Sequence, residues 1–216
     1  MLNMQQHPSA IARLRSQLAA GHIANVSDFW RDAESLNGPL VMPVEGAEDE
    51  REVTFLWRAW HSLQGVYLRL NRVTDKEHVA KGMMTPLPET DIWTLTLRLP
   101  ASYCGSYSLI EIPLGTPAKR IAQAGGRFAA LPGHADPLNK TPRISVRGSS
   151  QESVLTLDKA PAQPEWSGGS PTGQLLTSSR IIAGQSRRVQ LYMPDVDVLQ
   201  PLGLVVLPDG ETWFDH

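Results

Sequence analysis

The sequence predicts a mainly β protein: an immunoglobulin-like β-sandwich with short N-terminal helices, followed by the first strands of a second, α/β domain. Three observations carry this prediction. Seventeen glycines and seventeen prolines in 216 residues are typical of short strands joined by turns. Several segments alternate apolar and polar residues with the period of a strand. The continuous apolar run at 202–207 indicates a strand buried on both faces, as in a larger α/β sheet.

The N-terminal part carries two helical patterns. Apolar residues recur at helical spacing within 8–21, and Gly21 can end this first helix in a left-handed conformation. Ser27 can cap a second helix, in which Trp30 and Ala33 face inward. We therefore expect two short amphipathic helices that pack on the residues after them.

A strand period begins near residue 52. Residues 52–58 and 66–70 alternate, and 92–99 and 107–112 continue the pattern with β-branched and aromatic side chains. These four strands predict the sandwich. Its expected core includes Val53, Phe55, Trp57, Leu68, Trp93 and Leu97.

The next segments are shorter. Residues 118–130 predict a broken helix or an ordered loop, because the Gly125-Gly126 pair interrupts a helix at about 1 kcal/mol per glycine. Two more short strands are expected at 143–146 and 153–157, and later strand-like runs at 178–182 and 187–193 predict a hairpin.

The composition of the chain changes at a proline- and glycine-rich segment that is typical of a linker. This change predicts four parts. They are an N-terminal helical segment at 1–47, a β-sandwich accessory domain at 48–158, a linker at 159–174, and the truncated start of the α/β domain at 175–216.

Composition excludes several classes of function. A net charge of -2 argues against a basic nucleic-acid binder. No apolar run approaches the ~18 residues of a membrane span, and there is no signal peptide pattern. Cys104, the only cysteine, allows no internal disulfide and is expected to be a buried structural thiol, which fits the cytoplasm. The six histidines show no metal-ligand spacing, so no protein-bound metal or cofactor is expected.

Several stretches together resemble the enterochelin esterase family, in order and in spacing. The opening residues 1–4 look most similar to the branch that handles glucosylated enterochelin, the salmochelins. The stretches are Val53-Thr54-Phe55-Leu56-Trp57-Arg58, Val73-Thr74-Asp75, Thr90-Asp91-Ile92-Trp93, Gly105-Ser106-Tyr107, Ala135-Asp136-Pro137-Leu138-Asn139 and Leu207-Pro208-Asp209-Gly210-Glu211-Thr212-Trp213.

The resemblance implies a cytoplasmic serine esterase that cuts the trilactone backbone of a ferric tris-catecholate siderophore and so releases its iron, which travels within the substrate. In that family a β-rich domain precedes an α/β-hydrolase domain. The hydrolase half holds a Gly-x-Ser-x-Gly elbow and a later histidine, and both are expected after the strand that ends at Leu207. This sequence ends at His216, so we expect the chain alone to lack the catalytic serine and histidine and to be inactive. Its partners would be the siderophore and the C-terminal hydrolase domain of a longer chain.

Two segments invite a catalytic interpretation. Ser186 follows a Gly-Gln pair as in a nucleophile elbow, but Arg188 stands where the elbow requires a small residue, so a hairpin position is expected. Arg187 and Arg188 are more typical of a charged strand edge than of a ligand clamp. Gly210 and Glu211 follow the buried strand and could donate backbone N–H groups to an oxyanion, although an ordinary Pro-Asp-Gly turn has the same composition.

A trianionic ligand requires cations and aromatic faces. Arg58 beside Trp57 and Trp60, with Arg69 and Arg72 on the next strand, forms the nearest grouping and gives the candidate substrate-binding arginines. Strand alternation points Arg58 away from Trp57, so a solvated sheet face is the competing interpretation.

Two other classes of function stay open. One is a free-standing carbohydrate- or ligand-binding β-sandwich, and the other is an oligomerisation domain. The apolar run at 202–207 argues against a self-contained sandwich, because such a domain would not end in a strand buried on both faces.

Overall fold

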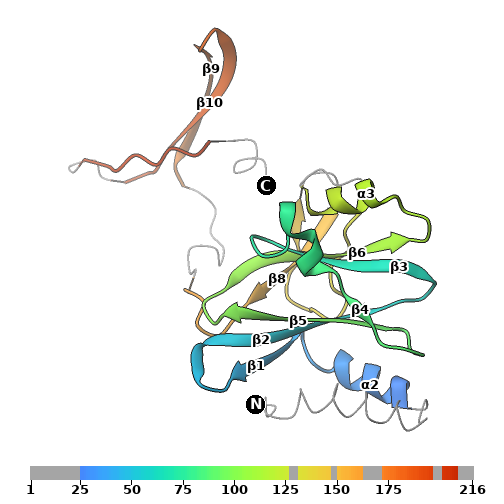
Figure 1. The fold of residues 1–216 in the computed structure, drawn as a ribbon. Helices are drawn as coiled ribbons and strands as arrows, with labels where there is room; N and C mark the ends of the chain where they lie inside the picture. The colour runs from blue at the N-terminus through green and yellow to red at the C-terminus, as the bar shows by residue number, and fades with distance from the viewer. Residues whose placement is uncertain (1–24, 127–130, 147–149, 163–171, 197–200, 209–216) are drawn as a thin grey trace. The chain divides into compact units, whose positions relative to one another are not determined.

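The computed structural model describes residues 25–126, 131–146, 150–162, 172–196 and 201–208, and the chain divides into two compact units, 1–161 and 162–216 (Figure 1). Within these described ranges, no helix is both long enough and apolar enough to cross a bilayer. The predicted helix at 8–21 lies outside the described residues.

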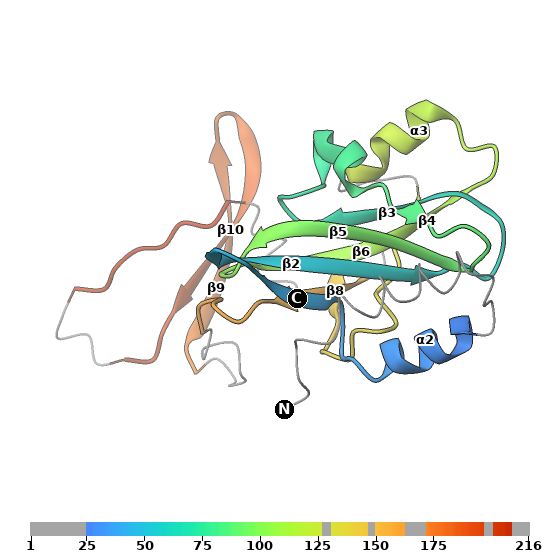
Figure 2. The same ribbon diagram turned by 60° about the horizontal axis from the view of Figure 1, so that its bottom comes forward.

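The first unit opens with helix α2, Asn25–Glu34. Trp30 and Ala33 are each 3% exposed, which confirms their inward orientation. The helix already begins at Asn25, so Ser27 lies within its first turn and not at its N-cap. The buried face of α2 joins a cluster below the first sheet (Figure 2), made of Phe29, Trp30, Ala33, Leu40, Leu56, Leu87, Ile92 and Leu138.

The first sheet has the strand order β1-β2-β5-β4, all antiparallel. Its strands are β1 (Leu40–Val44), β2 (Ala47–Arg58), β4 (Thr85–Pro86) and β5 (Ile92–Pro100). The sequence did not predict β1, which is short and contains Pro43. Because β1 is an edge strand, it tolerates a residue that cannot donate to the ladder.

The second sheet has the order β3-β6-β8-β7, also antiparallel. Its strands are β3 (Leu63–Leu70), β6 (Cys104–Pro113), β7 (Ile144–Val146) and β8 (Ser150–Thr156). The four strands predicted at 66–70, 107–112, 143–146 and 153–157 are confirmed as β3, β6, β7 and β8, with boundaries shifted by a few residues.

The two sheets share one apolar core. Val53, Phe55 and Leu68 are 0% exposed and belong to it, as predicted. The predicted core residues Trp57, Trp93 and Leu97 are only partly buried and pack against its border. Trp57 keeps a polar contact there, since its Nε1 donates to Glu111 Oε1 at 3.0 Å.

Short helical segments cover the outer face of the second sheet (Figure 2). They are η2 (Lys76–Gly82), α3 (Ala118–Ala122) and η3 (Gln123–Gly125), and the last two form the broken helix that the Gly125-Gly126 pair predicts. Tyr67 and Ile110 point toward them and are 0% exposed. The edge strand β3 and its neighbour β6 are therefore buried on both faces, which simple alternation had not indicated.

Gly82 is required for this covering layer to approach the sheet. A Cβ at Gly82 would lie 2.3 Å from the Leu68 carbonyl oxygen and 2.5 Å from Tyr67 Cε2. We expect Gly82→Ala to lower the free energy of unfolding by about 1 to 3 kcal/mol, the usual effect of overpacking. Chemical denaturation checks this value, with Gly203→Ala as control because no atom lies within 4 Å of the added Cβ. Equal stability of the two variants would contradict the close approach.

The described part of the second unit contains a hairpin, β9 (Gln174–Ile182) and β10 (Gln185–Met193). Its turn residues Ala183 and Gly184 have φ of 50° and 75°, as the two-residue turn with a right-handed twist requires. This confirms the predicted hairpin.

One local prediction is not confirmed and another is wrong. Residues 201–208 form no strand and are exposed, with Leu204 and Val205 each 80% accessible, because no other described strand pairs with them. Cys104 is exposed and not buried, since it is the first residue of β6 and lies at the end of the sheet.

Candidate ligand-binding surface

Arg58, the last residue of β2, is held by two aromatic rings and a carboxylate. Its Nε donates to Asp91 Oδ2 at 2.7 Å, and its guanidinium lies over the Trp60 ring at 4.3 Å and the Trp30 ring at 5.4 Å. Trp30 Nε1 donates to the other Asp91 oxygen at 2.8 Å. The ion pair and the cation–π contacts therefore fix the arginine in one place.

Trp60 is the exposed member of this group, with 76% of its surface accessible. One face of its indole packs on Arg58. Asp91 neutralises the charge of Arg58, so this surface offers an oriented aromatic ring more than a free cation.

Trp57 lies in a separate group, as strand alternation predicts. Glu111 accepts from Trp57 Nε1 and also lies 3.5 Å from His61 Nε2, while the Trp57 ring stacks at a tilt on His134, 6.0 Å away. Trp57 and Arg58 thus contact different carboxylates.

The other two candidate arginines have their own surroundings. Arg69 in β3 pairs with Glu152 at 3.0 Å, and its side chain is only 14% exposed. Arg72 is exposed in the turn after β3, with a left-handed φ of 63°. The described contacts of Arg58, Arg69 and Arg72 share no partner, so the structure does not gather them into one charged pocket.

The candidates from the second unit are placed only in part. Ser186 is exposed on β10 directly opposite Ile181, in the predicted hairpin. Gly210 and Glu211 lie outside the described residues. Among residues that the structure describes, no three His, Cys, Asp or Glu side chains gather as metal ligands would.

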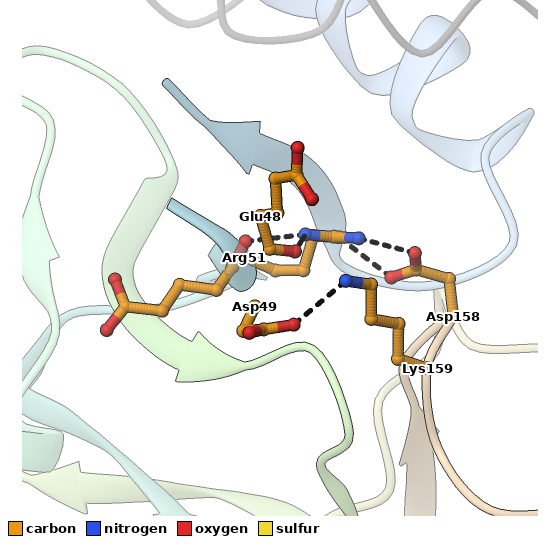
Figure 3. Close-up of polar contacts among 6 residues, drawn as sticks. Glu48, Asp49, Arg51, Asp158 and Lys159 are labelled. Carbon is orange, nitrogen blue, oxygen red and sulfur yellow. Dashed lines mark hydrogen bonds and ion pairs between the residues drawn. The ribbon is translucent and has the colours of Figure 1, made fainter. Parts of the chain in front are cut away.

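Sequence reasoning missed a charged cluster near the start of β2 (Figure 3). The Arg51 side chain is 10% exposed and binds both oxygens of Asp158, at 2.8 and 2.5 Å. Its Nη1 also donates to the carbonyl oxygens of Glu48 and Glu50. Beside it, Lys159 Nζ donates to Asp49 Oδ1 at 2.9 Å.

These pairs are electrostatically matched. The hydrogen bond from Arg51 lowers the pKa of Asp158, and the hydrogen bond from Lys159 lowers the pKa of Asp49. The donors of Arg51 are used within the cluster, which leaves little capacity for a ligand. The cluster ties β2 to the residues just before Pro161, where the first unit ends.

A second missed cluster is buried behind the loop at 135–139. Tyr107 Oη donates to Asp136 Oδ2 at 2.8 Å, and Asn139 Nδ2 donates to the Tyr107 hydroxyl at 3.0 Å. Asp136 also accepts from the Leu138 backbone N–H, and its own N–H donates to Ser153 Oγ. Burial raises the pKa of both Asp136 and Tyr107. This network fixes the loop on β6 and β8.

Most of the two sheets lies in a region of the chain that matches a known protein family. Residues 52–166 match the family described as enterochelin esterase, N-terminal. The chain belongs to this family. The matched region runs from within β2 through β8, so it contains both sheets except for the edge strand β1 and the first residues of β2.

Relatives of this enterochelin esterase family member include longer proteins. The chain is 81% identical to the Iron(III) salmochelin esterase of Escherichia coli O6:H1 over 216 residues, which is 100% of the chain and 53% of the relative. The chain spans about half the length of the curated relatives it matches.

Solved structures agree with this assignment. Ferric enterobactin esterase from Salmonella typhimurium matches with a TM-score of 0.52 and 28% identity, over 76% of this chain and 45% of that one. The enterobactin esterase of Shigella flexneri, determined in the presence of 2,3-di-hydroxy-N-benzoyl-serine, matches with a TM-score of 0.51 and 25% identity, over 77% and 44%. The predicted family resemblance is therefore confirmed.

Proposed function

We propose that this chain is the N-terminal part of a cytoplasmic esterase that hydrolyses the trilactone of a ferric catecholate siderophore and releases its iron. The observation that carries the proposal is the 81% identity to an Iron(III) salmochelin esterase along the whole chain, which accounts for only 53% of that relative. The catalytic serine and histidine are assigned to the remaining part of the longer protein. Incubating the full-length protein with ferric enterobactin and ferric salmochelin, and separating the products by chromatography, tests the proposal.

We infer further that the first unit is an immunoglobulin-like sandwich. The orders β1-β2-β5-β4 and β3-β6-β8 correspond to strands A, B, E, D and C, F, G of a constant-type immunoglobulin domain, with β7 as an addition. The shared core between the sheets supports the same inference.

We assign residues 1–47 to an N-terminal segment that adds helix α2 and the edge strand β1 to the accessory domain, 48–158 to the body of that domain, 159–174 to a linker and 175–216 to the start of the hydrolase domain. The apolar surface of the second unit supports this assignment. Leu204, Val205 and Val206 are 75% to 80% exposed, and the hairpin exposes several more apolar side chains. Burial against further strands of a hydrolase sheet would remove this surface from water. Gly210 and Glu211 would then follow a buried strand and could donate backbone N–H groups to the oxyanion.

For the ligand, we propose that Arg58, Arg69 and Arg72 contribute to siderophore binding in different ways. Asp91 and Glu152 neutralise Arg58 and Arg69, whereas Arg72 is exposed and offers a charge to a trianion. Arg58 acts mainly by orienting the Trp60 indole, on which an aromatic ring can stack.

We expect Arg72→Gln in the full-length protein to weaken binding of ferric enterobactin about fivefold, the effect of a ~1 kcal/mol charge interaction in water. The loss should be smaller at high salt. Titration by quenching of tryptophan fluorescence measures it, with Arg31→Gln as control because Arg31 is an exposed arginine on α2. Affinities equal to wild type for Arg58→Gln, Arg69→Gln and Arg72→Gln alike would leave these arginines as a solvated sheet face.

A carbohydrate-binding module is the second candidate, and the exposed indole of Trp60 favours it, because such rings stack on sugars. Titration of the 216-residue chain with neutral oligosaccharides and with ferric enterobactin separates the two. Saturable binding of the sugar alone would favour the module.

A further inference from the structure

The hairpin of the second unit places two arginines against each other. The register pairs Arg180 of β9 with Arg187 of β10. Directly opposed residues of an antiparallel pair project from the same face, so both guanidinium groups lie on one face near the turn. Both residues are exposed.

Both residues are positively charged, so their pairing is unfavourable within the hairpin alone. Like charges directly opposite each other destabilise a hairpin. The two strands, Gln174–Ile182 and Gln185–Met193, contain Arg180, Arg187 and Arg188 and no Asp or Glu, although the whole chain has a net charge of -2. Nothing within the hairpin can therefore neutralise the pair by a carboxylate.

Most arginines of the first unit with a described hydrogen-bond partner pair with a carboxylate, although Arg143 donates to the amide oxygen of Gln151. Five of them pair with carboxylates, namely Arg31 with Asp28, Arg51 with Asp158, Arg58 with Asp91, Arg69 with Glu152 and Arg98 with Glu50. Arg187 instead donates to the neutral amide oxygen of Gln185, at 2.5 Å. The neutral amide orients this guanidinium, and among the described residues no carboxylate pairs with Arg187.

We propose that Arg180 and Arg187 form an oxyanion-binding site for the catecholate oxygens of the ferric siderophore. The assignment rests on the proposed function. Two adjacent guanidinium forks match paired, negatively charged oxygens and can bind them bidentately. Three catecholate dianions around Fe³⁺ carry a net charge of -3, so this ligand neutralises both cations. A single protein carboxylate would compensate only one of them.

The test uses the full-length protein with the single variants Arg180→Gln and Arg187→Gln and the double variant. Each single change is expected to weaken binding of ferric enterobactin about five- to tenfold, and the double change more, with smaller losses at high salt. Arg180→Lys should retain part of the affinity, because it keeps the charge without the fork. Arg98→Gln serves as control, since Arg98 is an exposed arginine on a strand of the first unit.

Thermal melting without ligand separates this site from an internal ion pair. If a carboxylate elsewhere in the longer protein occupies the pair, the variants will melt at lower temperature and bind the siderophore like wild type, which would overturn the inference. Unchanged melting and unchanged affinity would overturn it as well. In either case the proposed function stands if the wild-type protein still hydrolyses the siderophore. A wild-type protein that neither binds nor hydrolyses the siderophore would overturn the proposed function together with the arginine site.

Discussion

The 216-residue chain alone is expected to release no dihydroxybenzoylserine from ferric enterobactin, whereas the protein extended to the length of its relatives is expected to hydrolyse it. Loss of the serine nucleophile or its histidine lowers the rate of a serine hydrolase by a factor on the order of 10⁶. An oxyanion donor contributes ~10² to 10³, so backbone groups at Gly210 and Glu211 could not compensate for a missing nucleophile.

Chromatography of reaction products measures this difference directly. The matched variant is Ser186→Ala, because Ser186 is the serine whose flanks come nearest to an elbow. In the extended protein this change should leave turnover unchanged, since Ser186 lies within a regular hairpin. Turnover by the short chain that disappears with Ser186→Ala would make Ser186 the nucleophile and reject the assignment of catalysis to the remaining sequence.

The regular strands could be predicted from the sequence because each carries its signal locally. Alternation located β2, β3, β5 and β6, and Val53, Phe55 and Leu68 were correctly placed in the core. Alternation did not reveal which residues on the outer face of a sheet are buried as well. Tyr67 and Ile110 are buried by η2, α3 and η3, segments whose position on the sheet no period-two pattern reveals. Residues 202–207 are the opposite case. Their apolar character predicts a buried strand, but it does not tell whether strands are present to pair with them, and these residues are exposed.

The polar clusters could not be predicted because their members lie far apart in sequence. Arg58 pairs with Asp91, 33 residues later, and Arg51 pairs with Asp158, 107 residues later. Proximity in the sequence suggested instead that Arg58, Arg69 and Arg72 act together. The fold separates them, because Arg58 ends a strand of one sheet and Arg69 lies in a strand of the other.

The second large effect is expected from Asp136→Ala. The change leaves the Tyr107 hydroxyl and the Leu138 N–H without their acceptor in a site where Asp136 is 1% exposed. Buried groups that lose a partner cost about 1 to 3 kcal/mol each. Removal of the carboxylate also relieves its own desolvation, which offsets part of this loss. We therefore expect the free energy of unfolding to fall by about 2 to 4 kcal/mol, measured by chemical denaturation at neutral pH.

Asp136→Asn is the matched variant, because the amide oxygen can still accept from Leu138 while the charge is gone. Burial raises the pKa of Asp136 above its ordinary value of 3.8, so ionisation is disfavoured in the folded state. The resulting contribution to stability is complete below the unfolded pKa and declines as the pH rises through the folded pKa. Stability of wild type relative to Asp136→Asn should therefore fall between acidic and neutral pH. A difference that instead grows with pH would show that the hydrogen bonds to the carboxylate outweigh its desolvation.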